Sequence, residues 1–248
     1  MHGTSAGKPA DSGTPHFDEP GRATSGEIGR RAAEGIAMIR ADLSEAAYRR
    51  AEGYLAGLDA DWARHIAAIG PCRLAAKPAR EPYEALLRAV AYQQLHARAG
   101  DAIVGRLLAL YADASFPSPR QILDTDPELQ RQCGFSAAKL ATIRGIAQAA
   151  LEGVVPARAQ AMAMADEALI ERLVPLRGVG RWTVEMLLIY TLERSDILPA
   201  DDWGVREGYR RLKGLQAAPA RRKMAEIGQA WSPYRTIAAW YLWRVPAT

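Results

Sequence analysis

Two short motifs hold the residues of this chain that are best suited to chemistry. The first is the glycine pair Gly178 and Gly180 in the segment LRGVGRW, where one predicted helix ends and the next begins. Closely spaced glycines permit a left-handed backbone and let bare main chain approach a bulky group. The free N–H groups and the positive dipole end of the second helix would point the same way, which suits a phosphate. A tight turn between two helices is the alternative interpretation of such a pair.

The second motif is the acid pair Asp201 and Asp202 in the segment LPADDW, about 20 residues after the glycines and just ahead of another predicted helix. An aspartate at this place can cap the helix by accepting N–H groups of its first turn. A fixed carboxylate can also stabilise a developing positive charge or assist attack by water. The residues alone leave both roles open.

Composition narrows the class of protein. The 248 residues carry a formal charge of +4, but residues 203–248 hold nine basic and two acidic side chains, a net of +7, which indicates a polyanionic partner. No apolar run approaches the roughly 20 residues of a transmembrane helix, and the N-terminus lacks the order of a secretory signal. Cys72 and Cys133 are predicted to be buried free thiols, and no two of the four histidines have metal-ligand spacing.

The elements that must position the two motifs are helices. Residues 1–25 are rich in Gly, Pro, Ser and Thr and are predicted to be disordered. Residues 26–248 are rich in helix formers without a sustained strand pattern, which predicts one all-α, two-lobed domain of about ten helices. The predicted helices cover residues 43–58, 81–96, 100–111, 118–125, a segment opening at 127, then 136–151, 166–174, 181–193, 205–212 and 234–243, with N-caps at Ser44, Ser136 and Asp166.

Taken together, the motifs resemble a known superfamily. The pattern L-x-G-V-G-x-W-T followed by P-x-D-D is similar to the helix–hairpin–helix DNA glycosylases, and most similar to their 3-methyladenine DNA glycosylase II family. The segments 83–99 (YEALLRAVAYQQLHARA), 134–147 (GFSAAKLATIRGIA) and 231–243 (WSPYRTIAAWYLW) agree with it. The resemblance covers roughly residues 41–244. It implies a helix–hairpin–helix at about 166–193 and a compact form without the extra β-containing domain of some bacterial members.

The resemblance assigns the chemistry to Asp202, which matches the family's catalytic aspartate, and we assign helix capping to Asp201. Cleavage of an N-glycosidic bond builds oxocarbenium character on the sugar, which one preorganised carboxylate can stabilise. Alkylated purines already carry positive charge and can leave without a protein acid, unlike the leaving groups of most sugar hydrolases. Members that also cut the DNA strand through a Schiff base have lysine where this chain has Trp182, which predicts a monofunctional enzyme.

The resemblance also implies a base pocket walled by Trp182, Met186 and Trp243. Trp182 offers a flat, electron-rich face to a cationic base, while Met186 stands where some relatives have a pocket tyrosine. Core packing is the competing interpretation of the aromatic C-terminal helix, and it suits Trp240 and Tyr241 better than Trp243.

Contacts with the DNA backbone are implied for the hairpin and for one further segment. They fall on Gly178, Gly180, Arg181, Thr183 and Lys139. Carbonyls of the hairpin, near Leu176 and Val179, would hold a structural Na⁺ or K⁺ ion.

A wedge that fills the gap left by a flipped base is implied at the end of the helix predicted over 81–96. The wedge is assigned to the segment Gln94, Leu95 and His96, with Gln94 or His96 as the favoured residue, because Leu95 is expected to lie in the core. A solvated helix end is the alternative for each polar residue.

The sequence therefore predicts a monofunctional glycosylase of base excision repair that removes alkylated purines, of the 3-methyladenine or 7-methylguanine type, from double-stranded DNA. It is expected to be a cytoplasmic monomer, associated with the nucleoid through DNA, with no membrane contact and no required cofactor. Two alternatives stay open: a glycosylase for deaminated or etheno-bases, and a non-catalytic helix–hairpin–helix DNA-binding module. Asp202 distinguishes the last, because a pure binder gains nothing from an acid that faces phosphates.

Overall fold

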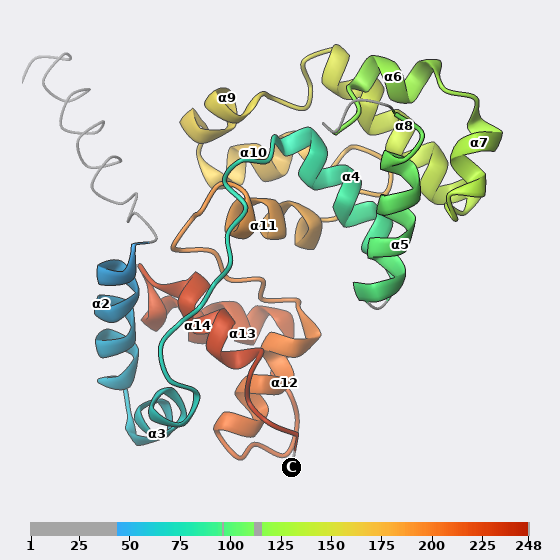
Figure 1. Ribbon diagram of the computed structural model, residues 1–248. Coiled ribbons are helices and arrows are strands. Elements are labelled where there is room, and N and C mark those ends of the chain that lie inside the picture. The colour runs from blue at the N-terminus through green and yellow to red at the C-terminus, as the bar shows by residue number, and fades with distance from the viewer. Residues whose placement is uncertain (1–43, 96, 112–115, 248) are drawn as a thin grey trace, which may run out of the picture. The chain divides into compact units, whose positions relative to one another are not determined.

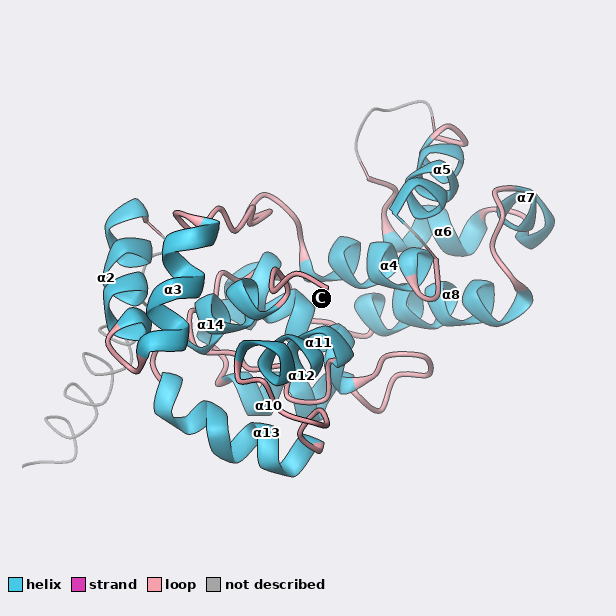
Figure 2. Cartoon of the chain, turned by 90° about the horizontal axis from the view of Figure 1, so that it is seen from below, coloured by secondary structure: helices cyan, strands magenta, loops and turns pink. Residues whose placement is uncertain are grey.

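The computed structural model describes residues 44–95, 97–111 and 116–247 of the chain. Every regular element in these ranges is a helix, which confirms the predicted all-α class (Figures 1 and 2). The segment 1–25, predicted to be disordered, lies outside the described residues, and so does the candidate wedge residue His96. None of the described helices is both long and apolar enough to cross a membrane.

One group of helices is built around α8. Helices α4 and α6 both pack on α8, α5 packs on α4, and α11 packs on both α4 and α10 (Figure 1). The members in chain order are α4 (Pro82–Tyr92), α5 (Ala97–Leu108), α6 (Pro119–Asp124), α7 (Pro127–Gln132), α8 (Ala137–Leu151), α9 (Arg158–Ala163), α10 (Asp166–Leu173) and α11 (Arg181–Tyr190).

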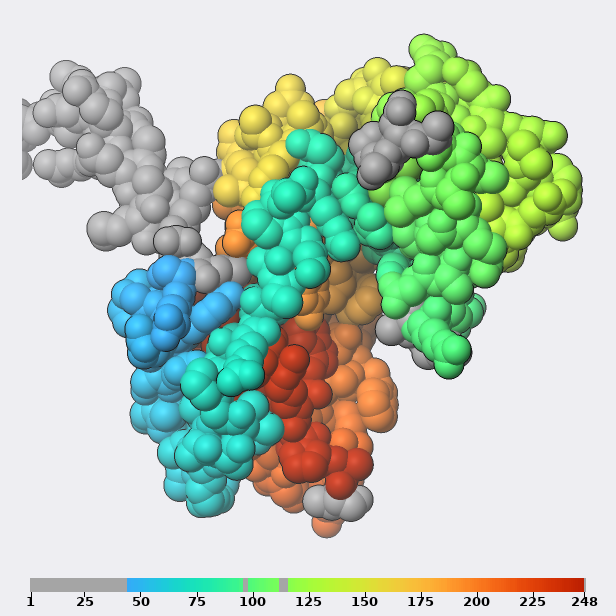
Figure 3. Space-filling view, viewed as in Figure 1, coloured from blue at the N-terminus to red at the C-terminus, as the bar shows by residue number. Residues whose placement is uncertain are grey.

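The second group joins the two ends of the described chain. Helix α14 packs on α2, α3 and α12, so the blue and red segments share one body in Figure 3. Its members are α2 (Glu45–Ala56), α3 (Ala60–Ile69), α12 (Trp203–Leu212), α13 (Arg221–Ile227), the 3₁₀ turn η1 (Gly228–Trp231) and α14 (Arg235–Leu242).

Two of the three predicted N-caps are found. Ser44 and Ser136 cap α2 and α8 as expected, and Ser118 caps α6 through a reciprocal capping box. Asp166 does not cap α10, because Ala165 holds the N-cap position and Asp166 is the first helical residue. Its carboxylate still stabilises the positive end of the helix dipole.

The predicted elements differ from the observed ones in two ways. Helices α3, α9 and α13 were not predicted; α9 and α13 each bury a single side chain, Ala161 and Met224, so they lack an apolar period. The helices predicted over 81–96 and 181–193 end earlier, at Tyr92 and Tyr190. Gln94 and Glu193 have φ of 57° and 56°, and this left-handed backbone does not continue a helix.

The C-terminal aromatic residues divide between core and site. Trp240 and Tyr241 are buried in the hydrophobic core, whereas Trp243 is only partly buried. Cys72 and Cys133 are buried and free, as predicted.

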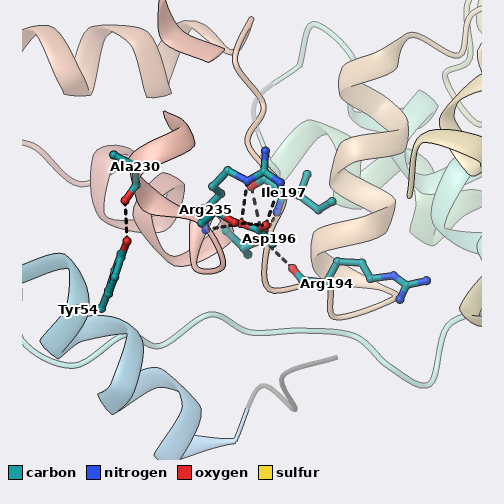
Figure 4. Close-up of polar contacts among 8 residues, drawn as sticks. Tyr54, Arg194, Asp196, Ile197, Ala230 and Arg235 are labelled. Carbon is teal, nitrogen blue, oxygen red and sulfur yellow. Dashed lines mark hydrogen bonds and ion pairs between the residues drawn. The ribbon is translucent and has the colours of Figure 1, made fainter. Parts of the chain in front are cut away.

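The start of α14 is fixed to the loop that follows α11 (Figure 4). Arg235 donates to both carboxylate oxygens of Asp196, at 2.7 and 2.9 Å. Burial alone would raise the pKa of Asp196, but hydrogen bonds from Arg235 and Ser232 outweigh it and hold the pKa below its usual value. The hydroxyl of Thr236 accepts the N–H of Ile197 at 3.0 Å, which adds a second tie between this loop and α14.

Candidate active site

A cavity of about 950 Å³ is bounded by α4, α11, the start of α12 and the end of α14. The predicted catalytic residue and all three predicted base-pocket residues line it, together with two of the wedge residues. The residues that the sequence analysis singled out on this wall are Asp202, Trp182, Met186, Trp243, Gln94 and Leu95.

Three N–H groups hold the carboxylate of Asp202. The main-chain N–H of Val205 donates to Oδ1 at 2.8 Å, and the indole Nε1 of Trp243 donates to the same oxygen at 2.9 Å. The indole Nε1 of Trp182 donates to Oδ2 at 2.7 Å. The carboxylate is thus fixed on the cavity wall with its oxygens in defined directions.

The division of roles within the acid pair was wrong in one respect. Asp202 itself is the N-cap of α12, whereas Asp201 is exposed and pairs with Arg206 at 3.8 Å. The cap bond to Val205 uses only Oδ1, so capping does not exclude a second role for Asp202, which also lines the cavity. The sequence could not separate the two roles, since either aspartate can precede a helix.

Aromatic and apolar side chains form the rest of the wall beside Asp202. Trp182 is 43% exposed, so one face of the indole is open to a ligand. Tyr190 also lines the cavity and was not predicted, since it belongs to no motif. Burial raises the pKa of its hydroxyl, which therefore stays protonated at neutral pH.

Basic side chains also line the cavity, and the sequence analysis missed them. These are Lys77, Arg80 and Arg88. Both arginines contact Glu84, Arg88 at 2.7 Å and Arg80 at 3.6 Å. Lys77 is a primary amine on the wall of the cavity, and an amine is the group that a Schiff base requires.

The hairpin between α10 and α11 needs its two glycines for different reasons. Gly178 has φ of 76°, and a Cβ there would lie 2.5 Å from Oγ1 of Thr142. Gly180 has an ordinary φ of −87°, so only the first glycine uses a left-handed backbone. A Cβ at Gly180 would meet nothing within 4 Å, and no described side chain caps α11. The first N–H groups of α11 thus face open space, as an anion site requires.

Two predicted backbone contacts of the hairpin have other partners. Arg181 donates to both oxygens of Glu167, at 2.6 and 2.8 Å, and to Glu185 at 3.0 Å. The bonds to Glu167 tie α10 to α11. Glu185 lies on α11 itself, and burial raises the pKa of its carboxyl group. Thr183 is buried, and its N–H donates to the carbonyl of Gly180. Sequence spacing reveals neither the ion pairs of Arg181 nor the burial of Thr183, and their contact with a phosphate stays a prediction.

Lys139 is also committed elsewhere, although we expected a phosphate contact. Its ammonium donates to the carbonyls of Ala91 and Gln93, at 3.0 and 2.7 Å, and burial lowers its pKa. The side chain of Gln93 donates in turn to the carbonyl of Gly178 at 3.0 Å. Lys139 therefore caps the end of α4 and helps to link it to the hairpin.

The end of α4 presents the wedge candidates to solvent. Gln94 is exposed with φ of 57°, and Leu95 is 40% exposed. The expectation that Leu95 lies in the core is wrong, because the left-handed residue before it ends the helix and turns the chain outward. Leu95 is thus an exposed apolar residue on the cavity wall.

A monovalent cation bound by carbonyls of the hairpin stays a prediction. The carbonyl of Leu176 accepts the N–H of Val179 at 3.0 Å, which uses one of its two lone pairs. In the ranges that the structure describes, no three His, Cys, Asp or Glu side chains gather in a way that suits a metal ion.

The basic side chains of residues 203–248 are less available to bind a polyanion than the formal charge of that segment indicates. Seven of its nine basic side chains form ion pairs, and four of the carboxylates involved lie outside the segment. With those four included, the local net charge falls from +7 to +3. The paired side chains are Arg206, Arg210, Arg211, Lys213, Arg222, Lys223 and Arg235, and the four carboxylates are those of Asp59, Asp61, Asp196 and Asp201.

Comparison with known proteins places this site in a family. The family model of the HhH-GPD superfamily base excision DNA repair protein matches residues 87–233, which include the hairpin and Asp202. DNA-3-methyladenine glycosylase 1 of Schizosaccharomyces pombe is 45% identical over 198 residues, covering 79% of this chain and 86% of that protein.

Solved structures agree with the sequence comparison. The S. pombe 3-methyladenine DNA glycosylase in complex with abasic DNA superposes with a TM-score of 0.72 at 43% identity, covering 79% of this chain and 95% of that one. A DNA-3-methyladenine glycosidase from Bacillus halodurans gives a TM-score of 0.69 at 30% identity, over 78% and 88% of the two chains. On this evidence the chain belongs to the HhH-GPD superfamily of base excision DNA repair proteins.

Proposed function

We propose that this protein is a DNA glycosylase that removes alkylated purines of the 3-methyladenine type from duplex DNA and leaves an abasic site. The observation that carries the proposal is the carboxylate of Asp202, held by three N–H donors on a cavity with aromatic walls. The relatives from S. pombe and B. halodurans, a 3-methyladenine glycosylase and a 3-methyladenine glycosidase, support the same substrate class.

The reaction follows from what the cavity offers. A flipped cationic purine would stack on the open face of Trp182, while its sugar lies beside Asp202. The C1′–N bond breaks with its electron pair going to the base, which leaves neutral, and positive charge develops on the sugar. The carboxylate of Asp202 stabilises that charge, and a water oxygen bonds to C1′ and releases its proton to Asp202 or to solvent.

The backbone of the DNA is held mainly by main chain in this proposal. The open N–H groups at the start of α11 would bind a phosphate, and Gln94 and Leu95 would fill the gap left by the flipped base. Arg181 and Lys139 position the hairpin and the end of α4. A monovalent cation at the hairpin would be structural.

We also propose that the protein does not cleave the DNA strand. Trp182 stands where lyases of the superfamily have lysine, so no amine is available at that position. Lys77 is the one amine to test, since it lines the same cavity. Borohydride treatment of the protein with abasic DNA should give no covalent adduct; an adduct that disappears in Lys77→Ala would show lyase chemistry.

Release of free bases tests the function directly. The protein is incubated in excess with duplexes that carry one 3-methyladenine, 7-methylguanine, hypoxanthine or ethenoadenine, and the released base is identified. We expect release of the methylated purines without added metal and in the presence of EDTA. Release of hypoxanthine or ethenoadenine alone would favour the alternative glycosylase, and DNA binding without any release would favour a binding module.

A further inference from the structure

The two oxygens of Asp202 are not equivalent. Oδ1 accepts two N–H groups, from Val205 and Trp243, and so uses both of its lone pairs. Oδ2 accepts one, from Trp182, and keeps one lone pair for the cavity. The donors come from three helices, so the carboxylate plane is fixed by the packing of α11, α12 and α14 together.

The contact with Trp243 depends on missing side chains along α12. A Cβ at Gly204 would lie 2.9 Å from Cδ1 of Trp243 and 3.1 Å from Oδ1 of Asp202. A Cβ at Gly208, one turn further on, would overlap the carbonyl of Leu242. These two glycines form a bare strip on α12 that lets the end of α14 come close enough to bring the Trp243 indole to Asp202.

We propose that Trp243 is a positioning residue whose indole N–H, together with that of Trp182, locks the Asp202 carboxylate so that Oδ2 faces the sugar of the flipped nucleotide. This inference rests on the proposed glycosylase function and adds to it a role for the indole N–H groups distinct from stacking. A helix cap alone fixes one oxygen and leaves the carboxylate free to rotate about its Cβ–Cγ bond. A second donor on Oδ1 and one on Oδ2 remove that freedom before the substrate arrives.

Neutral donors also draw charge from the carboxylate, which would weaken its field at the sugar. The test must therefore measure the field itself. A duplex with a cationic pyrrolidine abasic analogue imitates the charged sugar, and a duplex with a neutral tetrahydrofuran analogue is its uncharged control. The ratio of the two dissociation constants, neutral over cationic, is here named the charge-discrimination ratio.

Trp243→Phe keeps an aromatic ring but removes the indole N–H together with the fused five-membered ring, so the comparison with Gly204→Ala, which keeps the indole, is needed. We expect it to lower the charge-discrimination ratio and the single-turnover excision rate about tenfold each, the usual order for one hydrogen bond to a charged group. Affinity for the tetrahydrofuran duplex should stay within about twofold. Gly204→Ala keeps every donor but displaces Trp243, and should shift the same two quantities in the same direction. Thermal unfolding of each variant shows that the fold is retained.

The decisive comparison is made in the Asp202→Asn background. If Trp243 acts through the carboxylate, Trp243→Phe should change the ratio no further there. An equal change in both backgrounds, or an unchanged ratio and rate in Trp243→Phe and Gly204→Ala alone, overturns the inference. The proposed function fails by a different result: wild-type protein that releases no base and shows no preference for the pyrrolidine duplex.

Discussion

Alanine at Gly178 should destabilise the fold, while alanine at Gly180, two positions further on, should weaken DNA binding instead. At Gly178 the left-handed backbone costs a residue with a Cβ about 1–2 kcal/mol. The added methyl group would also lie 2.5 Å from Oγ1 and 2.8 Å from Cγ2 of Thr142, and such overpacking costs about 1–3 kcal/mol. The sum, about 2–5 kcal/mol, should lower the Tm by roughly 4–20 °C for a chain of this size.

At Gly180 neither cost arises. The backbone is ordinary for alanine and the added methyl would meet nothing within 4 Å, so stability should change by about 0.5 kcal/mol at most. The methyl would, however, stand in the open space before the first N–H groups of α11. If a phosphate binds there, affinity for duplex DNA should fall about tenfold.

The assay separates strain from overlap. Thermal unfolding is followed by circular dichroism for Gly178→Ala in the wild-type and Thr142→Ala backgrounds, and duplex affinity by fluorescence anisotropy. In the Thr142→Ala background the overlaps with Oγ1 and Cγ2 are removed and only a 3.2 Å contact with Cβ of residue 142 stays, so mainly the backbone strain of about 1–2 kcal/mol should remain. The reasoning is refuted if Gly178→Ala costs the same in both backgrounds, or if Gly180→Ala lowers the Tm as much as Gly178→Ala.

Three further results are expected. DNA affinity should fall with salt equally for damaged and undamaged duplexes. A plot of the logarithm of the binding constant against the logarithm of the salt concentration should have a slope shallower than about −6, the value for seven neutralised phosphates, because most basic side chains of 203–248 are already paired. A steeper slope in salt titrations would contradict this. Asp196→Asn should lower the Tm at pH 7. Since the folded pKa of Asp196 is lowered, its stabilisation is present above the ordinary value near 4 and is lost as the pH falls through the folded pKa. The Tm values of variant and wild type should therefore converge as the pH falls below about 4, and a constant difference throughout an acid titration would contradict this. Trp182→Ala should slow excision more than Trp182→Phe, which keeps a stacking face, while both lose the N–H; equal single-turnover rates would argue against stacking.

The fold class and the residues that line the cavity could be predicted from the sequence more fully than the role of each residue. Most of the longer helices were predicted, although the amphipathic α3 was missed. The resemblance also identified Asp202, Trp182, Met186 and Trp243, which line one cavity. Composition and motif order are local properties, and they identify elements of this kind well.

The roles that sequence could not assign all depend on tertiary partners. Arg181 and Lys139 are basic residues near a phosphate-binding motif, yet one is held by two carboxylates and the other by the carbonyls that end α4. Leu95 is apolar, yet the left-handed Gln94 exposes it. For Arg181 and Lys139 the partners include groups on another helix, and for Leu95 the backbone turns where no motif marks it. Residue type alone reveals neither the ion pairs and hydrogen bonds of the two basic residues nor the exposure of Leu95.

The central claim is that the charge of Asp202 drives base release. Single-turnover excision from a duplex with one 3-methyladenine or 7-methylguanine, compared among wild type, Asp202→Asn and Asp201→Asn, tests it most directly. Asparagine can keep the cap bond to Val205, although its amide would face the donor of Trp182, so the variant should fold and bind DNA. The account predicts a loss of at least about 10²–10³ in rate for Asp202→Asn and near wild-type rates for Asp201→Asn. Near wild-type rates in Asp202→Asn would contradict it.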